Sequence, residues 1–319
     1  MNSISNRILY EDNHLIVVNK LPSEIVQGDK TGDVCLLDDV KEYIKVKYDK
    51  PGNVFAGLVH RIDRPVSGAV VFAKTSKALS RMTVKVKDRD FRKIYLALVK
   101  NHPPKQADVL EDYIVKNEKM NKSFVVPEGT KEAKLARLSY RVVGKSDTFY
   151  LLEIELFTGR HHQIRCQLAH IGCPIRGDLK YGYPRSNPDG SISLHAYHIA
   201  FEHPVLKTPI EVTAPLPEVA PWTAFRQLTV DSLDGRQRTE NPPSQVLSPK
   251  SRVLSPQSQV LSPQSPVSKS KTLSNQVDDS PENDEIKSTA RQKQPRDAVH
   301  QCGAFSIEKA LQFGCAPGF

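Results

Sequence analysis

The alternation of short apolar runs with turn residues ends near residue 228, and this limit constrains the fold more than any other feature of the 319-residue chain. Between residues 230 and 299 aromatic residues are absent, and Ser, Pro, Gln and charged residues dominate. A segment of this composition cannot bury enough apolar surface to offset the entropy lost on folding. We therefore expect one folded domain at residues 1–228 and a disordered tail at residues 229–319.

A seven-residue repeat lies in the expected tail from Ser244 to Lys271, as SQVLSPK, SRVLSPQ, SQVLSPQ and SPVSKSK. Proline recurs in it, which excludes a coiled coil because each proline removes a helix hydrogen bond and clashes with the preceding turn. We expect an extended tether there. Residues 304–313 are consistent either with a short terminal helix or with a frayed end.

The apolar pattern within residues 1–228 predicts both strands and helices. Period-two alternation and short apolar runs predict strands, whereas apolar residues three and four apart predict helices. The expected strands are a pair within 8–19, a strand at 68–73, another at 94–100, a hairpin of 135–143 with 149–157, and a pair of 194–201 with 210–214. The expected helices are at 36–48, at about 75–87 and directly before Gly172.

The positive charge of the chain belongs to its folded part. Residues 1–228 carry 34 Lys and Arg against 26 Asp and Glu, which is +8 of the total net charge of +9. A polyanion such as nucleic acid is one reading of this excess, and an ordinary solvated surface is the other.

The five cysteines form no CxxC pair and predict no disulfide framework. The N-terminal residues resemble neither a signal peptide nor a transit peptide, and no apolar run approaches membrane-spanning length. We expect a cytoplasmic protein without a membrane segment.

The stretch LVHRIDRPVSG, Leu58 to Gly68, places Asp63 between Arg61 and Arg64 and three residues after His60. A nearby cation favours the ionised form of a carboxyl group and lowers its pKa. Asp63 is then better suited to act as a nucleophile or electrostatic stabiliser than as a proton donor. The alternative is an ordinary surface Asp–Arg pair at a turn.

Two further clusters fit an RNA site. The sequence TGRHHQIR, Thr158 to Arg165, lies at an expected strand-to-helix junction, where Arg160 and Arg165 could hold a phosphate or pair with Asp63. Tyr95, in FRKIYLALV, could stack on a nucleobase and offer its phenol to a proton. The alternatives are a basic helix start and a core aromatic residue.

Metal and nucleotide cofactors are not indicated. His195, His198 and His203 have no Cys or carboxylate at a recognised ligand spacing, and a strand would point His195 and His198 to opposite faces. The chain contains no P-loop and no GxGxxG sequence. We predict a site without metal or cofactor.

These clusters resemble the RluA-type RNA pseudouridine synthase family. The family's HRLD-R-x-T-S-G segment is similar to HRIDRPVSGAVVFAK here, its K-x-Y motif to RKIYLALV, and its TGRTHQIR…GxPIxGDxxYG stretch to TGRHHQIRCQLAHIGCPIRGDLKYG. Its closing LHA…L-x-F-x-HP signature is similar to LHAYHIAFEHP, and the resemblance extends over residues 8–217. It implies an α+β fold, a single catalytic domain with a mixed, mainly antiparallel central sheet and helices around a central cleft.

The resemblance also implies the chemistry. Asp63 would attack uridine at the sugar or the base, Tyr95 would stack on the base and help remove the C5 proton, and Arg165 would pair with Asp63. Arg61 would fill the space left by the flipped uridine. The implied substrate is structured RNA, ribosomal or transfer, bound by a monomer through His60, Arg61, Arg64, Arg160, His162 and Gln163. A non-catalytic RNA-binding protein and a nucleoside hydrolase are the rival functions.

Four departures from the family pattern stand out. Ile62 replaces Leu, Val66 replaces Thr and His161 replaces Thr, which leaves the implied chemistry intact. The sequence NKLPSE, residues 19–24, replaces NKPxG, so both the proline and the glycine are lost. This change puts the substrate in doubt more than the catalysis.

Overall fold

The computed structural model describes residues 3–28 and 32–226. The chain divides into two units, Met1–Val246 and Leu247–Phe319, and all the described residues belong to the first. The predicted tail at 229–319, with its repeat and possible terminal helix, lies outside the described residues.

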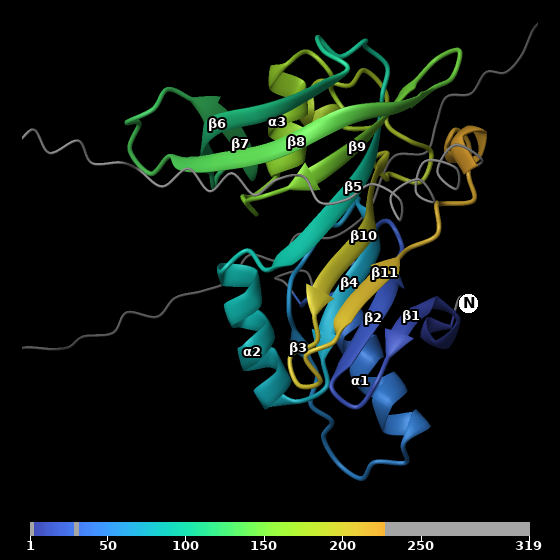
Figure 1. The fold of residues 1–319 in the computed structure, drawn as a ribbon. Coiled ribbons are helices and arrows are strands. Elements are labelled where there is room, and N and C mark those ends of the chain that lie inside the picture. The colour runs from blue at the N-terminus through green and yellow to red at the C-terminus, as the bar shows by residue number, and fades with distance from the viewer. Residues whose placement is uncertain (1–2, 29–31, 227–319) are drawn as a thin grey trace, which may run out of the picture. The chain divides into compact units, whose positions relative to one another are not determined.

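Strands dominate the described part of the chain (Figure 1). The strands are β1 (Ile8–Glu11), β2 (Leu15–Lys20), β3 (Gly57–Leu58), β4 (Ser67–Ala73), β5 (Phe91–Val99), β6 (Ala107–Asn117), β7 (Lys122–Val126), β8 (Lys134–Lys145), β9 (Tyr150–Leu156), β10 (Leu194–Glu202) and β11 (Pro209–Thr213). The α-helices are α1 (Leu36–Lys47), α2 (Ser76–Lys87) and α3 (Gln163–His170), and the 3-10 helices are η1 (Ile4–Arg7), η2 (Leu179–Tyr181) and η3 (Trp222–Phe225).

The strands form one sheet in the order β1-β2-β4-β10-β5-β9-β8-β6-β7, with β11 beside β10 and β3 beside β4. Only β4 and β10 run parallel among the described pairs. The sheet is therefore mixed and mainly antiparallel, as predicted. In Figure 1, α1 and α2 lie beside the β2 and β4 end of this order, and α3 lies beside β6 and β8.

The parallel contact between β4 and β10 requires glycine at position 68. Gly68 has a φ of +115°, and a Cβ atom there would lie 2.2 Å from the carbonyl oxygen of Ala196 on β10. Residues with a side chain rarely adopt this backbone conformation, and the space beside Ala196 has no room for a Cβ atom. Because Gly68 follows Asp63 by five residues, this close contact fixes where the loop that carries Asp63 joins the sheet.

Alternate residues of β2 and β4 face two separate cores. Ile16 and Val18 of β2 pack with Val40 and Ile44 of α1, whereas Leu15 and Val17 pack with residues of α2. The core on the α1 side also holds residues from the Asp63 loop, from β5 and from α3, namely Ile62, Val66, Tyr95, Ile164 and Leu168. One apolar layer thus joins the three segments that carry the predicted catalytic residues.

Most elements agree with the sequence patterns. The predicted helix at 75–87 is α2, and its N-terminal Thr75 accepts a hydrogen bond from the Ala78 amide at 3.1 Å. The hairpin of β6 and β7 was not predicted. In β6 the buried residues Leu110 and Ile114 lie on one face, but Asp112 stands between them on that face, so no clear apolar alternation marks the strand.

Candidate active site

Asp63 lies in the loop between β3 and β4. Its carbonyl oxygen accepts a hydrogen bond from the Val66 amide at 3.0 Å, which closes a turn. Ile62 on one side and Val66 on the other are buried in the core, at 9% and 2% exposed. The carboxylate between them is 30% exposed, so the loop is anchored while its acid stays accessible to a ligand.

The cation that contacts Asp63 is Arg165, which comes from α3. Its Nη1 atom donates to Asp63 Oδ2 at 3.1 Å, and its Nε and Nη2 atoms donate to the two carboxylate oxygens of Asp178 at 2.7 and 2.9 Å. Arg165 is 5% exposed and Asp178 is 1% exposed. The two hydrogen bonds to Asp178 fix the plane of the guanidinium group. They thereby fix the direction in which Nη1 points toward Asp63.

The charge of Arg165 is secured by its two carboxylate partners. Burial by itself lowers the pKa of an arginine, but here the hydrogen bonds and charge of Asp178, followed by those of Asp63, raise it above its ordinary value. The Arg165 cation is therefore permanent. It also lies over the ring of Tyr181, with the guanidinium carbon 5.1 Å from the ring centre.

His162 borders the carboxylate as a neutral ring. Burial, together with the nearby charge of Arg165, lowers the pKa of His162 to about 2. Its Nε2 atom is 3.6 Å from Asp63 Oδ2, a contact that is not an ion pair because the ring is uncharged. The Tyr181 hydroxyl accepts from the Ser123 amide at 2.8 Å and lies 3.1 Å from His162 Nδ1. The Tyr181 hydroxyl therefore contacts one ring nitrogen of His162, while the other ring nitrogen faces Asp63.

Tyr95 lies on β5 in the same apolar layer, 7% exposed. Burial, followed by the negative charge of Asp63, raises the pKa of Tyr95. Its hydroxyl makes no hydrogen bond within residues 3–28 and 32–226. Tyr95 is therefore a neutral phenol within electrostatic reach of Asp63.

The fully buried Lys20 clamps the loop that carries Asp63. Its Nζ atom donates to the carbonyl oxygens of Leu21, Arg64 and Val66 at 2.8, 3.0 and 2.7 Å. Two of these carbonyls belong to the residues one and three positions after Asp63. Burial lowers the pKa of Lys20 to about 7, while three acceptors match the three protons of its ammonium form.

The NKLPSE departure is accommodated by local bonds. Leu21, in place of the family's proline, has an amide that donates to Glu24 Oε2 at 2.9 Å, and Glu24 pairs with Arg7 at 2.8 Å. Ser23, in place of glycine, has a φ of +69°, and its amide donates to the Arg64 carbonyl at 2.9 Å. A proline could not make the first bond, and the second bond holds this loop against the Asp63 loop.

The predicted RNA-contact residues around Asp63 are spread apart. His60 accepts the Val71 amide at 3.3 Å and packs on Phe91, and burial lowers its pKa to about 3. The exposed Arg64 pairs with Asp33 at 3.2 Å. The exposed Arg61 makes no ion pair with Asp63 in the described part of the chain. The guanidinium beside Asp63 is therefore that of Arg165 and not those of its sequence neighbours.

The predicted residues before α3 have partners of their own. Arg160 donates through Nε to the Leu135 carbonyl at 2.9 Å. Gln163 accepts from the Thr158 hydroxyl at 2.8 Å and donates to the Arg137 carbonyl at 3.1 Å. Gln163 is buried and holds the turn at the start of α3. Of the predicted set, the structure brings together Asp63, Tyr95, His162 and Arg165.

Three residues of the site were missed by the sequence analysis, namely Lys20, Asp178 and Tyr181. Asp178 and Tyr181 lie in GDLKYG, which resembles the family, and Lys20 lies in the part of NKLPSE that still agrees with the family's NKPxG. Position within those stretches was therefore a signal that could have identified them, but no local pattern says which side chain each one meets.

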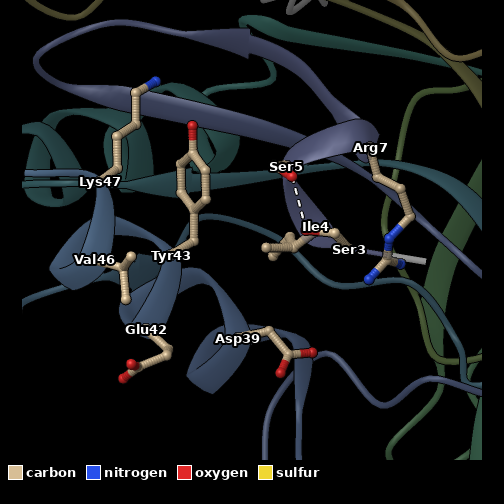
Figure 2. A pocket seen from close by; sticks show the side chains of 9 residues that line it. All are labelled: Ser3, Ile4, Ser5, Arg7, Asp39, Glu42, Tyr43, Val46 and Lys47. Atoms are coloured by element: carbon tan, nitrogen blue, oxygen red, sulfur yellow. Dashed lines mark hydrogen bonds between the residues drawn. The ribbon is translucent and has the colours of Figure 1, made fainter. Parts of the chain in front are cut away.

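Two cavities among the described residues lie away from this site. One of about 520 Å³ lies between η1 and α1 and is lined by residues such as Arg7, Asp39 and Lys47 (Figure 2). Another of about 490 Å³ lies between the end of α2 and the β10–β11 turn. No group of three or more side chains suited to a metal occurs among the described residues. None of the described helices is long and apolar enough to cross a membrane.

Comparisons with known proteins give one family. The RNA pseudouridylate synthase family matches residues 14–170. Ribosomal large subunit pseudouridine synthase C of Vibrio vulnificus is 31% identical over 221 residues, covering 67% of each chain. The protein of the same name in Buchnera aphidicola is 34% identical over 221 residues, covering 67% of this chain and 68% of the relative.

Solved structures with the same fold include two human proteins. RNA pseudouridylate synthase domain containing 4 superposes with a TM-score of 0.58 at 23% identity, covering 72% of this chain and 94% of the other. RNA pseudouridylate synthase domain containing 1 gives 0.53 at 22% identity, covering 74% and 96%. These likenesses concern the fold.

The substitution Asp178→Asn tests whether Arg165 depends on its buried partner. It leaves a buried cation with one full carboxylate instead of two, and we expect the free energy of unfolding to fall by about 3 kcal/mol. Urea denaturation measures this change. Glu118→Gln, which removes an exposed partner of Lys116, is the control and should have no measurable effect. Equal stability of Asp178→Asn and wild type would contradict the account.

Proposed function

This chain belongs to the RNA pseudouridylate synthase family and isomerises uridine to pseudouridine in RNA, and we propose that Asp63 carries out this reaction while Arg165 holds it in place. The observation that supports the assignment is the hydrogen bond from Arg165 Nη1 to Asp63 Oδ2, anchored on its other side by the buried Asp178.

The reaction balances without any added reagent. The bond from C1′ to N1 of uridine breaks, the base turns, and a bond from C1′ to C5 forms. C5 loses a proton and N1 gains one, so no water, electron carrier or metal enters the overall equation. The reaction requires a group that holds the sugar or the base while the bond between them is broken. An ionised carboxylate serves either as a nucleophile toward the sugar or the base, or as a stabiliser of positive charge on the sugar.

The Arg165 cation positions the Asp63 carboxylate for this role, because its hydrogen bond to Oδ2 fixes one edge of that group. Only one carboxylate oxygen of Asp63 is bonded to Arg165, which leaves the other oxygen available to the substrate. The neutral His162 ring adds no competing charge on the same side.

Tyr95 is the proposed route for the C5 proton. Because burial and Asp63 raise its pKa, Tyr95 is a phenol and not a phenolate at neutral pH. A phenol accepts a proton from carbon only if its own proton passes to another base. The Asp63 carboxylate, once released from the substrate, can accept that proton. Its negative charge already affects the pKa of Tyr95. We assign Tyr95 both this relay and stacking on the target base.

The substrate we propose is structured RNA, ribosomal or transfer. The net charge of +8 on residues 1–228 suits a polyanion. Flipping a base out of its stack costs a few kcal/mol, which contacts to phosphates must offset. The exposed Arg61 and Arg64 flank Asp63. Arg61 is suited to fill the space that the flipped base leaves in the stack, and Arg64 is suited to bind the RNA backbone. The names of the bacterial relatives make large-subunit ribosomal RNA the first substrate to test. We propose a cytoplasmic monomer that needs no metal or cofactor.

The substitution Asp63→Asn tests the catalytic assignment directly. We expect kcat to fall by at least about 10⁴-fold while RNA binding stays the same, because the amide keeps the shape but loses the charge and nucleophilicity. Pseudouridine is measured in transcripts of ribosomal and transfer RNA incubated with the purified full chain. The control is Asp147→Asn, at an exposed turn, which should keep full activity. An active Asp63→Asn enzyme would falsify the assignment.

The substitution Tyr95→Phe separates proton transfer from stacking. The ring remains and only the hydroxyl is lost, so we expect kcat to fall by about 10²- to 10⁴-fold with little change in KM. Because this hydroxyl makes no hydrogen bond in the described structure, the free energy of unfolding should change by less than about 1 kcal/mol. Tyr197→Phe, at a buried tyrosine of β10, is the control. An unchanged kcat in Tyr95→Phe would remove Tyr95 from the proton route.

We propose that residues 1–228 form the catalytic domain and that residues 229–319 are not needed for the isomerisation. The proposal rests on the described core, which η3 closes with the buried Trp222 and Phe225. Deletion of residues 230–319 should therefore leave kcat/KM within about threefold of the full chain, since no site residue is removed. The rate is compared on the same RNA. A folded but inactive truncated protein would show that the tail takes part.

A further inference from the structure

Lys93, on β5, is a half-buried cation that none of the site interactions uses. Burial lowers its pKa. Its ammonium group has no ion pair and no hydrogen bond within the part of the chain that the structure describes. Removing a charge from water without a partner is costly. A half-buried ammonium group without an internal partner is therefore suited to bind an anion from outside the chain.

The neighbouring basic residues differ from Lys93 in this respect. Arg92, the preceding residue on β5, donates to both carboxylate oxygens of Glu155 on β9 at 2.8 and 3.0 Å. On β8, Arg141 makes the same two-oxygen contact with Glu153. These pairs show that carboxylates are available along this sheet, and that Lys93 faces away from them.

The position of Lys93 joins the two loops of the candidate site. Side chains alternate along a strand, so Lys93 points to the same face of β5 as Tyr95 two residues later. A Cβ atom built on Gly159 would lie 3.9 Å from the Lys93 Nζ atom. On its other side, the charge of Lys93 contributes to the low pKa of His60. Lys93 thus lies between the loop that leads to Asp63 and the turn that leads to Arg165.

The ammonium group can be reached by a ligand. Gly159 is exposed and carries no side chain, so the ammonium lies next to open backbone at the surface. Tyr95 is not the partner, because the charged group that affects its pKa, after burial, is Asp63. An anion carried by the substrate can therefore reach the Lys93 ammonium group.

We propose that Lys93 binds a backbone phosphate next to the flipped target uridine. This inference rests on the proposed function. A phosphate is the anion that every nucleotide of RNA carries, and a half-buried ammonium binds it as a point charge. The contact exists both before and during the reaction, so it affects binding of RNA and not the chemical step.

The test uses Lys93→Met in the full chain, with the RNA segment in which the wild type makes pseudouridine. We expect the Kd for this RNA to rise roughly tenfold, as for loss of one charge-assisted hydrogen bond, with kcat within about threefold of wild type. The slope of log Kd against log salt should become shallower by about 0.7, the value for one phosphate of a single strand. Lys93→Arg, which keeps the charge, should retain most of the affinity.

Neutral phosphates identify the contact. Synthetic RNAs carry one uncharged methylphosphonate at each phosphate in turn on both sides of the target uridine. At one position the change should weaken binding to wild type about tenfold and have no effect on Lys93→Met, because the partner is already lost. Lys77→Met, on α2, is the charge-matched control and should respond to every methylphosphonate as the wild type does.

The outcomes distinguish this inference from the function on which it rests. If every methylphosphonate weakens Lys93→Met as much as wild type, or if Lys93→Met binds RNA as tightly, the phosphate contact is refuted while the enzyme remains established. A fall in kcat at unchanged Kd would assign Lys93 to the chemistry instead. A wild type that makes no pseudouridine would overturn both proposals. Thermal unfolding of Lys93→Met should match wild type, since no internal partner is lost; if it does not fold, Lys93→Gln replaces it.

Discussion

The guanidinium group of Arg165 lies between two carboxylates, Asp63 and Asp178, and this buried contact ties together three segments distant in sequence. Asp63 enters on the loop between β3 and β4, Arg165 on α3, and Asp178 on the turn before η2. Each segment is held by the sheet or by its apolar layer, so the sheet order determines whether the ion pairs form. Asp178 is buried, whereas Asp63 remains accessible. Arg165 therefore contacts one carboxylate that holds it in place and one that can meet the substrate.

The charges around the site have distinct origins. Burial and Arg165 keep His162 neutral, and burial and Asp63 keep Tyr95 a phenol. The charged groups that face each other at the site are thus the Asp63 carboxylate and the Arg165 guanidinium, and Lys93 adds a further cation at the edge. The neutral uracil base can approach the Asp63 carboxylate, while the phosphates of the RNA backbone contact the basic side chains. The Lys20 ammonium, beneath the loop, positions Asp63 through backbone carbonyls and does not face the substrate.

The sequence allowed most strands and all three α-helices to be predicted, because their apolar periods were clear. The hairpin of β6 and β7 was missed, since Asp112 interrupts the apolar face of β6 between Leu110 and Ile114. Asp63, Tyr95 and Arg165 were selected from motifs, and the pairing of Arg165 with Asp63 was expected from two motifs considered together and from the family resemblance. The flanking Arg61 and Arg64 were named as cations beside Asp63 because they are its sequence neighbours. The contacts of Asp178 and Lys20 depend on how the sheet brings distant loops together, which no local pattern encodes.

The most direct measurement of the central claim is a map of pseudouridine in total RNA from cells that lack this chain. The cells are complemented with the wild type or with Asp63→Asn, and each RNA is mapped at single-nucleotide resolution. The account predicts one or a few sites that disappear without the chain and return only with the wild type. Sites restored equally by Asp63→Asn, or no site that responds to either protein, would contradict it and favour a role in binding RNA.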